Sequence, residues 1–151
     1  MTFRIHAIAA EHLDDVRRTE RDVSDNRIEH LVAEGGEPLR CCLRYARAGE
    51  RLILFGYAPP IDSTSPYREI GAVFACESRC EGPAGDEYPF RGKPQVLRAY
   101  NSRGWIRDAL VHDGADPESA IERLLSDPLV TQLHSRNVAY GCFMFVVSRS
   151  P

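Results

Sequence analysis

The sequence predicts an α+β fold, with a mainly antiparallel sheet of about seven or eight strands, curled toward a partial barrel, and two helices. Short apolar segments of strand length recur along the chain, whereas helical periodicity is confined to two places. Few helical segments separate consecutive strands. Neighbouring parallel strands need long crossover connections, so this order favours antiparallel pairing.

The first third of the chain is predicted to contain two strands and one helix. Residues 3–7 alternate weakly and indicate a short strand. Residues 9–18 indicate a helix whose apolar positions are Leu13 and Val16. The apolar residues of 26–33 are spaced approximately as in a strand, so this segment is predicted to be one. A Gly-Gly-Glu-Pro turn follows it.

Residues 39–46 and 51–57 are predicted to form an antiparallel hairpin around the tight connection 48–50. The first segment alternates, and the second is apolar on both faces, as in a central strand. Because side chains alternate along a strand, Cys41 and Cys42 are expected on opposite faces.

The middle of the chain combines loops with further strands. Prolines exclude regular strand pairing in 58–67, and 78–94 is a second Gly/Pro-rich connection. Residues 70–76 indicate a buried strand. Residues 95–100 and 105–111 predict a hairpin.

The strongest helix signal covers residues 117–126. Asp116 is a favourable N-cap, and Pro117 occupies the first helical position, where no backbone N–H is needed. One apolar stripe contains Ala120, Ile121, Leu124 and Leu125. Residues 130–135 and 142–147 predict a final pair of strands.

Length and composition indicate one cytoplasmic domain covering residues 1–151. The net charge of −3 provides no basic surface for nucleic acid or an anionic membrane, and neither is expected as a partner. No export signal or membrane-spanning segment is visible. The five cysteines are therefore expected to be reduced.

Several short motifs occur in a fixed order along the chain. They comprise Pro38, Arg40, Cys42, Leu43, Gly49, Glu50, Pro66, Tyr67, Gly71, Phe74, Arg98, Tyr100, Asn101, His134, Gly141, Cys142 and Phe143. Their order and spacing resemble the bacterial domain-of-unknown-function family 1203 over roughly residues 3–149. Leu39 and Ala72 depart from the Cys and Pro usual in that family. The resemblance implies no activity, cofactor or substrate, and the departure at Leu39 weakens any mechanism that needs a Cys-Arg-x-Cys dithiol.

Cysteine chemistry is one candidate function. A metal set could combine Cys76, Cys80, Cys41, Cys42, Cys142 and His134. Structural zinc favours two closely spaced cysteine pairs, and adjacent cysteines on a strand point apart, so no metal is expected. Arg40 and Arg44 could instead lower the pKa of the Cys42 thiol, with His134 as a base. Ordinary buried packing of these cysteines is the favoured interpretation.

A binding site for an anion is the second candidate. Arg98 lies within a buried-looking strand and needs a partner, which could be the carboxylate of Glu50 or Glu69. Alternatively, several cationic side chains converge on a carboxylate or phosphate ligand, with a tyrosine beside the Pro-rich loop. The candidate ligand-binding residues are Arg40, Cys42, Tyr67, Arg98, His134 and Arg136.

The leading hypothesis is a small-molecule binding protein, or a minor enzyme, with an Arg/His pocket for an anionic ligand. The alternative is a protein–protein interaction or dimerisation module, which leaves homo-oligomerisation open. A thiol redox or zinc protein is the third hypothesis. The sequence identifies no catalytic residue and no cofactor.

Overall fold

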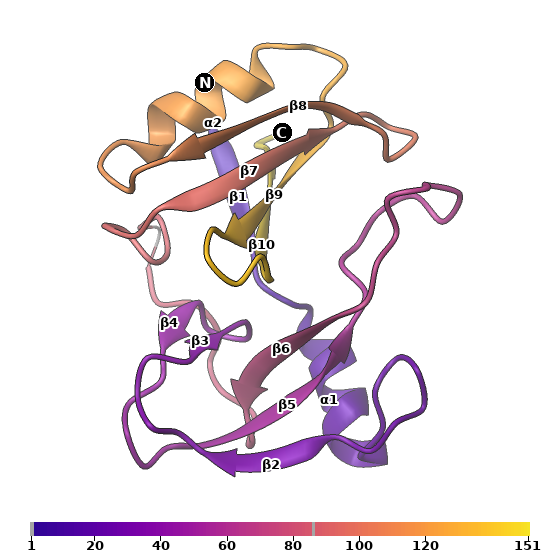
Figure 1. Ribbon diagram of the computed structural model, residues 1–151, viewed down its shortest axis with the longest axis vertical. Helices are drawn as coiled ribbons and strands as arrows, with labels where there is room; N and C mark the ends of the chain where they lie inside the picture. Colours follow the sequence, from indigo (N-terminus) through magenta and orange to yellow (C-terminus); the bar gives the residue numbers. More distant parts are fainter. Residues whose placement is uncertain (1, 86) are drawn as a thin grey trace. The chain divides into compact units, whose positions relative to one another are not determined.

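The computed structural model describes residues 2–85 and 87–151 (Figure 1). In these residues the chain is α+β, with two helices and ten strands in two mostly antiparallel five-stranded sheets that do not close into a barrel. The predicted fold class is confirmed, although the strands are more numerous than expected and form two sheets where one was predicted. The chain divides into two compact units. Unit 1 contains residues 1–6, 59–69 and 90–151, and unit 2 contains residues 7–58 and 70–89.

Unit 1 is an antiparallel sheet with one helix. Its elements are β1 (Phe3–His6), β7 (Gln95–Tyr100), β8 (Ile106–His112), α2 (Pro117–Leu125), β9 (Gln132–Asn137) and β10 (Phe143–Arg149). The strand order is β1-β10-β9-β7-β8. The predicted pairing of β7 with β8 and the predicted final strand pair, β9 with β10, are both confirmed.

Helix α2 forms where its capping and periodicity predicted it. The Asp116 side chain accepts a hydrogen bond from the backbone N–H of Ser119 at 3.2 Å. The helix packs against β7, β8 and β9, and Leu124 is only 2% exposed. Leu97 and Ala99 are fully buried and alternate with the half-buried Arg98 along β7, so the two faces of this strand differ in polarity.

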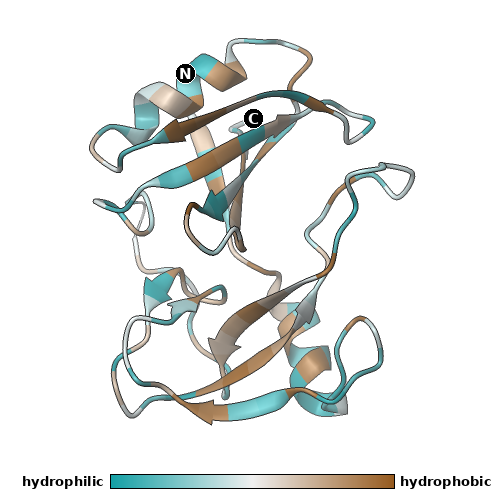
Figure 2. Cartoon of the chain, in the orientation of Figure 1, coloured by the Kyte–Doolittle hydropathy of each residue, from teal (hydrophilic) through white to brown (hydrophobic). Residues whose placement is uncertain are grey.

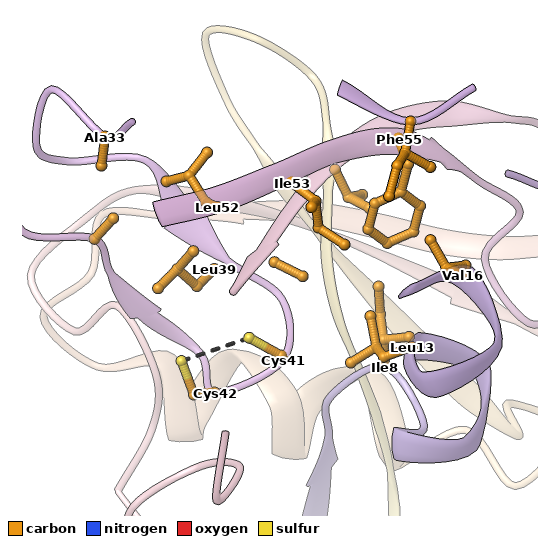
Figure 3. Close-up of a cluster of buried hydrophobic side chains, with 14 residues drawn as sticks. Ile8, Leu13, Val16, Ala33, Leu39, Cys41, Cys42, Leu52, Ile53 and Phe55 are labelled. Atoms are coloured by element: carbon orange, nitrogen blue, oxygen red, sulfur yellow. Dashed lines mark hydrogen bonds between the residues drawn. The ribbon is translucent and has the colours of Figure 1, made fainter. Parts of the chain in front are cut away.

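Unit 2 contains the second sheet and α1. Its elements are α1 (Ala10–Thr19), β2 (Glu29–Val32), β3 (Pro38–Leu39), β4 (Arg44–Tyr45), β5 (Arg51–Tyr57) and β6 (Gly71–Cys76). The strand order is β2-β5-β6-β3-β4, and only the short contact between β3 and β6 is parallel. The segment along β5 is visibly apolar (Figure 2). Leu13 and Val16 of α1 lie beside Phe55 of this strand in the core (Figure 3).

The predicted hairpin of 39–46 with 51–57 is wrong. β5 pairs with β2 and β6, while residues 40–43 form a turn between β3 and β4. The turn closes through a hydrogen bond of 2.9 Å from the backbone N–H of Leu43 to the carbonyl of Leu39. Leu43 has a φ of 56°, a left-handed conformation that is uncommon for a non-glycine residue. The alternating pattern of this segment therefore reflects a buried turn and not a strand.

Among the described residues, no helix has the length and apolar character needed to cross a membrane.

Candidate functional site

The most concentrated group of chemically reactive side chains is a cluster of four cysteines in unit 2. Its members, here called the cysteine cluster, are Cys41, Cys42, Cys76 and Cys80. All four Sγ atoms lie within 4.8 Å of one another. The cluster joins three parts of the unit: the turn between β3 and β4, the end of β6, and the segment that follows β6.

The turn at residues 40–43 brings the two adjacent cysteines together. The Sγ atoms of Cys41 and Cys42 are 3.8 Å apart, and both side chains are buried (Figure 3). The expectation that these side chains occupy opposite faces is wrong, because these residues are not in a strand. One of the two arguments against a metal site, that these adjacent side chains point apart, therefore fails; the argument from the spacing of cysteine pairs is unaffected.

Backbone and arginine contacts fix the Cys76 side of the cluster. The backbone N–H of Cys76 donates to the Sγ of Cys41 at 3.2 Å. The guanidinium of Arg17 in α1 donates to the Cys76 carbonyl at 3.0 and 3.2 Å. Hydrogen bonds from outside the ligand set orient the ligands of metal sites, and these contacts provide that kind of support.

The cluster favours a thiolate at neutral pH. Hydrogen bonds from the thiols of Cys41 and Cys42 lower the pKa of Cys76 to about 4, against the opposing effects of burial and of Cys80. Hydrogen bonds to Cys41 and Cys76, together with burial, raise the pKa of Cys42. The positive charge of Arg44 also lowers the pKa of Cys76. Negative charge is thus concentrated on the sulfur of Cys76.

Arg44 is held beside the cluster by Glu50. Two hydrogen bonds of 2.7 Å join its guanidinium to the two carboxylate oxygens of Glu50. This pairing raises the pKa of Arg44, and it lowers the pKa of Glu50 to about 2. The ion pair anchors the chain immediately after the turn that carries Cys41 and Cys42.

The spacing of the sulfurs is compatible with tetrahedral coordination. Zinc–sulfur bonds of about 2.3 Å in a tetrahedron place sulfurs about 3.8 Å apart. The separation of Cys41 and Cys42 already matches this value, and no separation in the cluster exceeds it by more than about 1 Å. Modest side-chain rotation would therefore bring all four thiolates to one metal ion.

Four of the predicted ligand-binding residues lie in unit 1. Arg98 and His134 are directly opposite each other in the pairing of β7 with β9. The ring of Tyr67 lies 6.4 Å from that of Tyr100, which lies 4.7 Å from the ring of His134. Arg136 forms a two-pronged ion pair with Glu69.

The other two predicted residues lie in unit 2. The buried side chain of Arg40 donates to the carbonyl of Pro38, and Cys42 belongs to the cysteine cluster. Their convergence with the predicted residues of unit 1 stays a prediction. Cys142 and His134, which were included in the candidate metal set, lie in unit 1 and do not belong to the cysteine cluster.

Sequence reasoning found the cysteines of the cluster but not their arrangement. The spacing of Cys76 and Cys80, with three residues between them, is a usable metal-ligand signal. The adjacent pair Cys41-Cys42 gave no such signal, because it matches no common ligand spacing. Only the turn conformation makes both thiols available to the same site.

One family model matches the chain over residues 36–149, and its description is "Protein of unknown function (DUF1203)". The matched range includes all four members of the cysteine cluster, as well as Arg98 and His134. No curated protein and no solved structure gives a significant match.

Proposed function

The chain belongs to the DUF1203 family of proteins of unknown function, and from its own geometry we propose that it is a zinc-binding protein with a four-cysteine site. The ligands are the thiolates of the cysteine cluster, and the observation that carries the proposal is their mutual proximity within 4.8 Å. Four thiolates around one position suit zinc, which favours tetrahedral sulfur coordination.

Ordinary packing of small apolar cysteines explains this arrangement less well. Packing alone gives no reason for four thiols to share one position, or for a backbone N–H and an arginine charge to act on them. Those features favour thiolate, which is the form that binds metal.

The proposed role of the metal is structural. A site with four protein ligands leaves no open position for substrate, which is the pattern of structural zinc. The ion would link the β3–β4 turn to the end of β6 and to the segment carrying Cys80. Because β3 and β4 contain only two residues each, this part of the sheet has few backbone hydrogen bonds of its own. Metal coordination would supply the missing stability.

Metal analysis of the reduced, full-length protein tests the proposal. We expect one zinc ion per chain after purification without chelator, and a tetrahedral thiolate-to-metal spectrum after replacement with Co²⁺. Single substitutions of Cys41, Cys76 or Cys80 by Ser should abolish tight binding. Cys142→Ser is the matched control, because it removes a thiol outside the cluster, and it should bind normally.

The possible results separate zinc from the competing thiol chemistry. Absence of bound metal, together with a featureless Co²⁺ spectrum, would overturn the proposal. Loss of free thiols in denatured protein that has not been reduced would indicate a disulfide and favour the redox hypothesis. Iron in place of zinc would keep the four-thiolate site but contradict the choice of metal.

A further inference from the structure

A second site, unrelated to the cysteine cluster, is indicated on the polar face of β7 and β9 in unit 1. Arg98 and His134 are cross-strand partners, so their side chains project from the same face of the sheet. Tyr100 lies two residues beyond Arg98 and therefore shares this face. A guanidinium nitrogen of Arg98 is 3.4 Å from the Tyr100 hydroxyl, which is a long hydrogen bond.

The segment 59–69 borders this face. The carbonyl of Pro60 accepts hydrogen bonds from Nε2 of His134 at 3.1 Å and from the amide of Gln132 at 3.0 Å. Tyr67 from the same segment approaches the ring of Tyr100 edge-on. Aromatic rings therefore surround Arg98 on this face, and the Arg136–Glu69 ion pair lies further along β9.

His134 contributes no positive charge to this face at neutral pH. The side chain is only 2% exposed, and burial lowers its pKa to about 4. Because a carbonyl can only accept, Nε2 carries the single proton of the neutral ring. His134 is thus a buried, uncharged ring, held in place by its hydrogen bond to Pro60.

Among the residues that the structure describes, Arg98 has no carboxylate partner, which a half-buried guanidinium normally has. The two glutamates predicted as its partners pair with other arginines: Glu69 with Arg136, and Glu50 with Arg44. Arg98 makes no ion pair with any residue that the structure describes. Within the described part of the chain, the Arg98 side chain makes one long hydrogen bond, to Tyr100, which leaves most of its five N–H donors available.

We propose that Arg98 binds the carboxylate of a small organic acid, with the Tyr100 hydroxyl as a second donor and Tyr67 packing against the acid's apolar part. Glu69 neutralises Arg136, and His134 is neutral, so Arg98 supplies one uncompensated positive charge. This charge matches a monoanionic carboxylate better than a phosphate dianion. The planar guanidinium fork also suits the two oxygens of a carboxylate. Aromatic neighbours favour a ligand with an apolar or aromatic body.

Binding of simple anions to the full-length, reduced protein tests this proposal. The probes are benzoate, acetate and inorganic phosphate, each compared with chloride at the same ionic strength, using calorimetry and thermal unfolding. We expect benzoate to bind and to raise the unfolding temperature, acetate to do so more weakly, and phosphate to behave like chloride. A phosphate response equal to that of benzoate would contradict the assignment of a carboxylate ligand.

Matched variants identify the residue responsible. Arg98→Gln should weaken benzoate binding by about tenfold or more, because it removes hydrogen bonds made by a charged donor. Tyr100→Phe keeps the ring and removes only the hydroxyl, and should weaken binding by about two- to tenfold. Arg103→Gln is the control: this exposed arginine of the same unit lies over Trp105 and should leave binding unchanged.

Three results would overturn the proposal. They are the absence of any benzoate-specific effect, full binding by Arg98→Gln, and an equal loss of binding in Arg103→Gln. If Arg98→Gln fails to fold, the Tyr100→Phe variant decides the question, since unaltered benzoate affinity would then contradict the proposed site. None of these results depends on metal binding, which is measured separately by metal content.

Discussion

The backbone N–H of Cys76 points at the sulfur of Cys41, with 3.2 Å between nitrogen and Sγ. This contact links the end of β6 to the turn between β3 and β4, which are 35 residues apart in the chain. The accepting sulfur of Cys41 is buried. The sheet therefore holds two of the four proposed ligands in place before any metal binds.

Zinc binding should make the stability of unit 2 depend on a chelator. For a metal that binds only the folded chain, free zinc at 100 times its dissociation constant adds about 2.7 kcal/mol to the free energy of unfolding. We expect a chelator to lower the unfolding temperature of the wild-type protein and of Cys142→Ser. Without chelator, the Cys41→Ser variant should already have a lower unfolding temperature than wild type, and the chelator should not lower it further. A chelator effect of equal size in Cys41→Ser, measured by thermal unfolding, would contradict this prediction.

The packing of α2 predicts a large effect of Leu124→Ala. Leu124 is 2% exposed, and the helix packs on three strands of unit 1. The substitution should lower the free energy of unfolding by about 2–5 kcal/mol, because it removes buried methyl groups and leaves a cavity. Urea denaturation measures the difference. Glu122→Ala, on the exposed side of the same helix, should change stability by no more than about 0.5 kcal/mol.

Local sequence patterns predicted most of the secondary structure, because those elements are determined by local physics. The N-cap Asp116 and the stripe through Leu124 correctly indicated α2. The alternation in β7, β8 and β9 correctly assigned Arg98 and His134 to strands, with their neighbours on alternate faces. Such signals depend on residues close in the chain and need no knowledge of tertiary contacts.

The turn at residues 40–43 could not be predicted in the same way. Its stability depends on a left-handed Leu43 and on burial against β6, and neither is encoded by a glycine or proline at that position. This single error placed Cys41 and Cys42 on opposite faces and counted against a metal site, so that zinc binding ranked only within the third hypothesis. The partners of the two glutamates were also missed: Glu50 pairs locally with Arg44, whereas Glu69 pairs with Arg136, 67 residues away in the chain.

His30 should stabilise unit 2 at low pH more than at high pH. Hydrogen bonding to Glu20 is the largest effect and raises the pKa of His30. Burial opposes it, and the charge of Glu20 and the hydrogen bond to Glu77 add to the increase. A raised pKa means that the stabilisation is complete below the unfolded value of about 6.5 and is lost as pH rises through the native value. The free energies of unfolding of wild type and His30→Gln, measured by urea denaturation, should therefore converge above neutral pH. Because these groups are exposed, added salt should reduce the difference at low pH.

If the stability difference between wild type and His30→Gln grew with rising pH, the prediction would be contradicted. The charged form of His30 would then not be the stabilising one. Glu20→Gln provides an independent check, because removing the principal acceptor should lower the pKa of His30. That pKa can be measured directly by NMR titration of the imidazole protons.

His134 should produce the opposite pH dependence in unit 1. Its native pKa of about 4 is below its ordinary value, chiefly because the ring is buried, so the unfolded chain binds the proton more tightly. Stability is therefore retained above pH 6.5 and lost progressively as pH falls toward 4, by about 3 kcal/mol in total. His112, whose pKa is also lowered by burial, contributes in the same direction.

The contribution of His134 alone is obtained by comparing wild type with His134→Gln. The difference in their free energies of unfolding should be measured by urea denaturation at pH values from 7.5 to 4. If the free energies of unfolding of wild type and His134→Gln changed in parallel with pH, protonation of the buried ring would not destabilise the fold. That result would contradict the assignment of His134 as a neutral side chain beside Arg98.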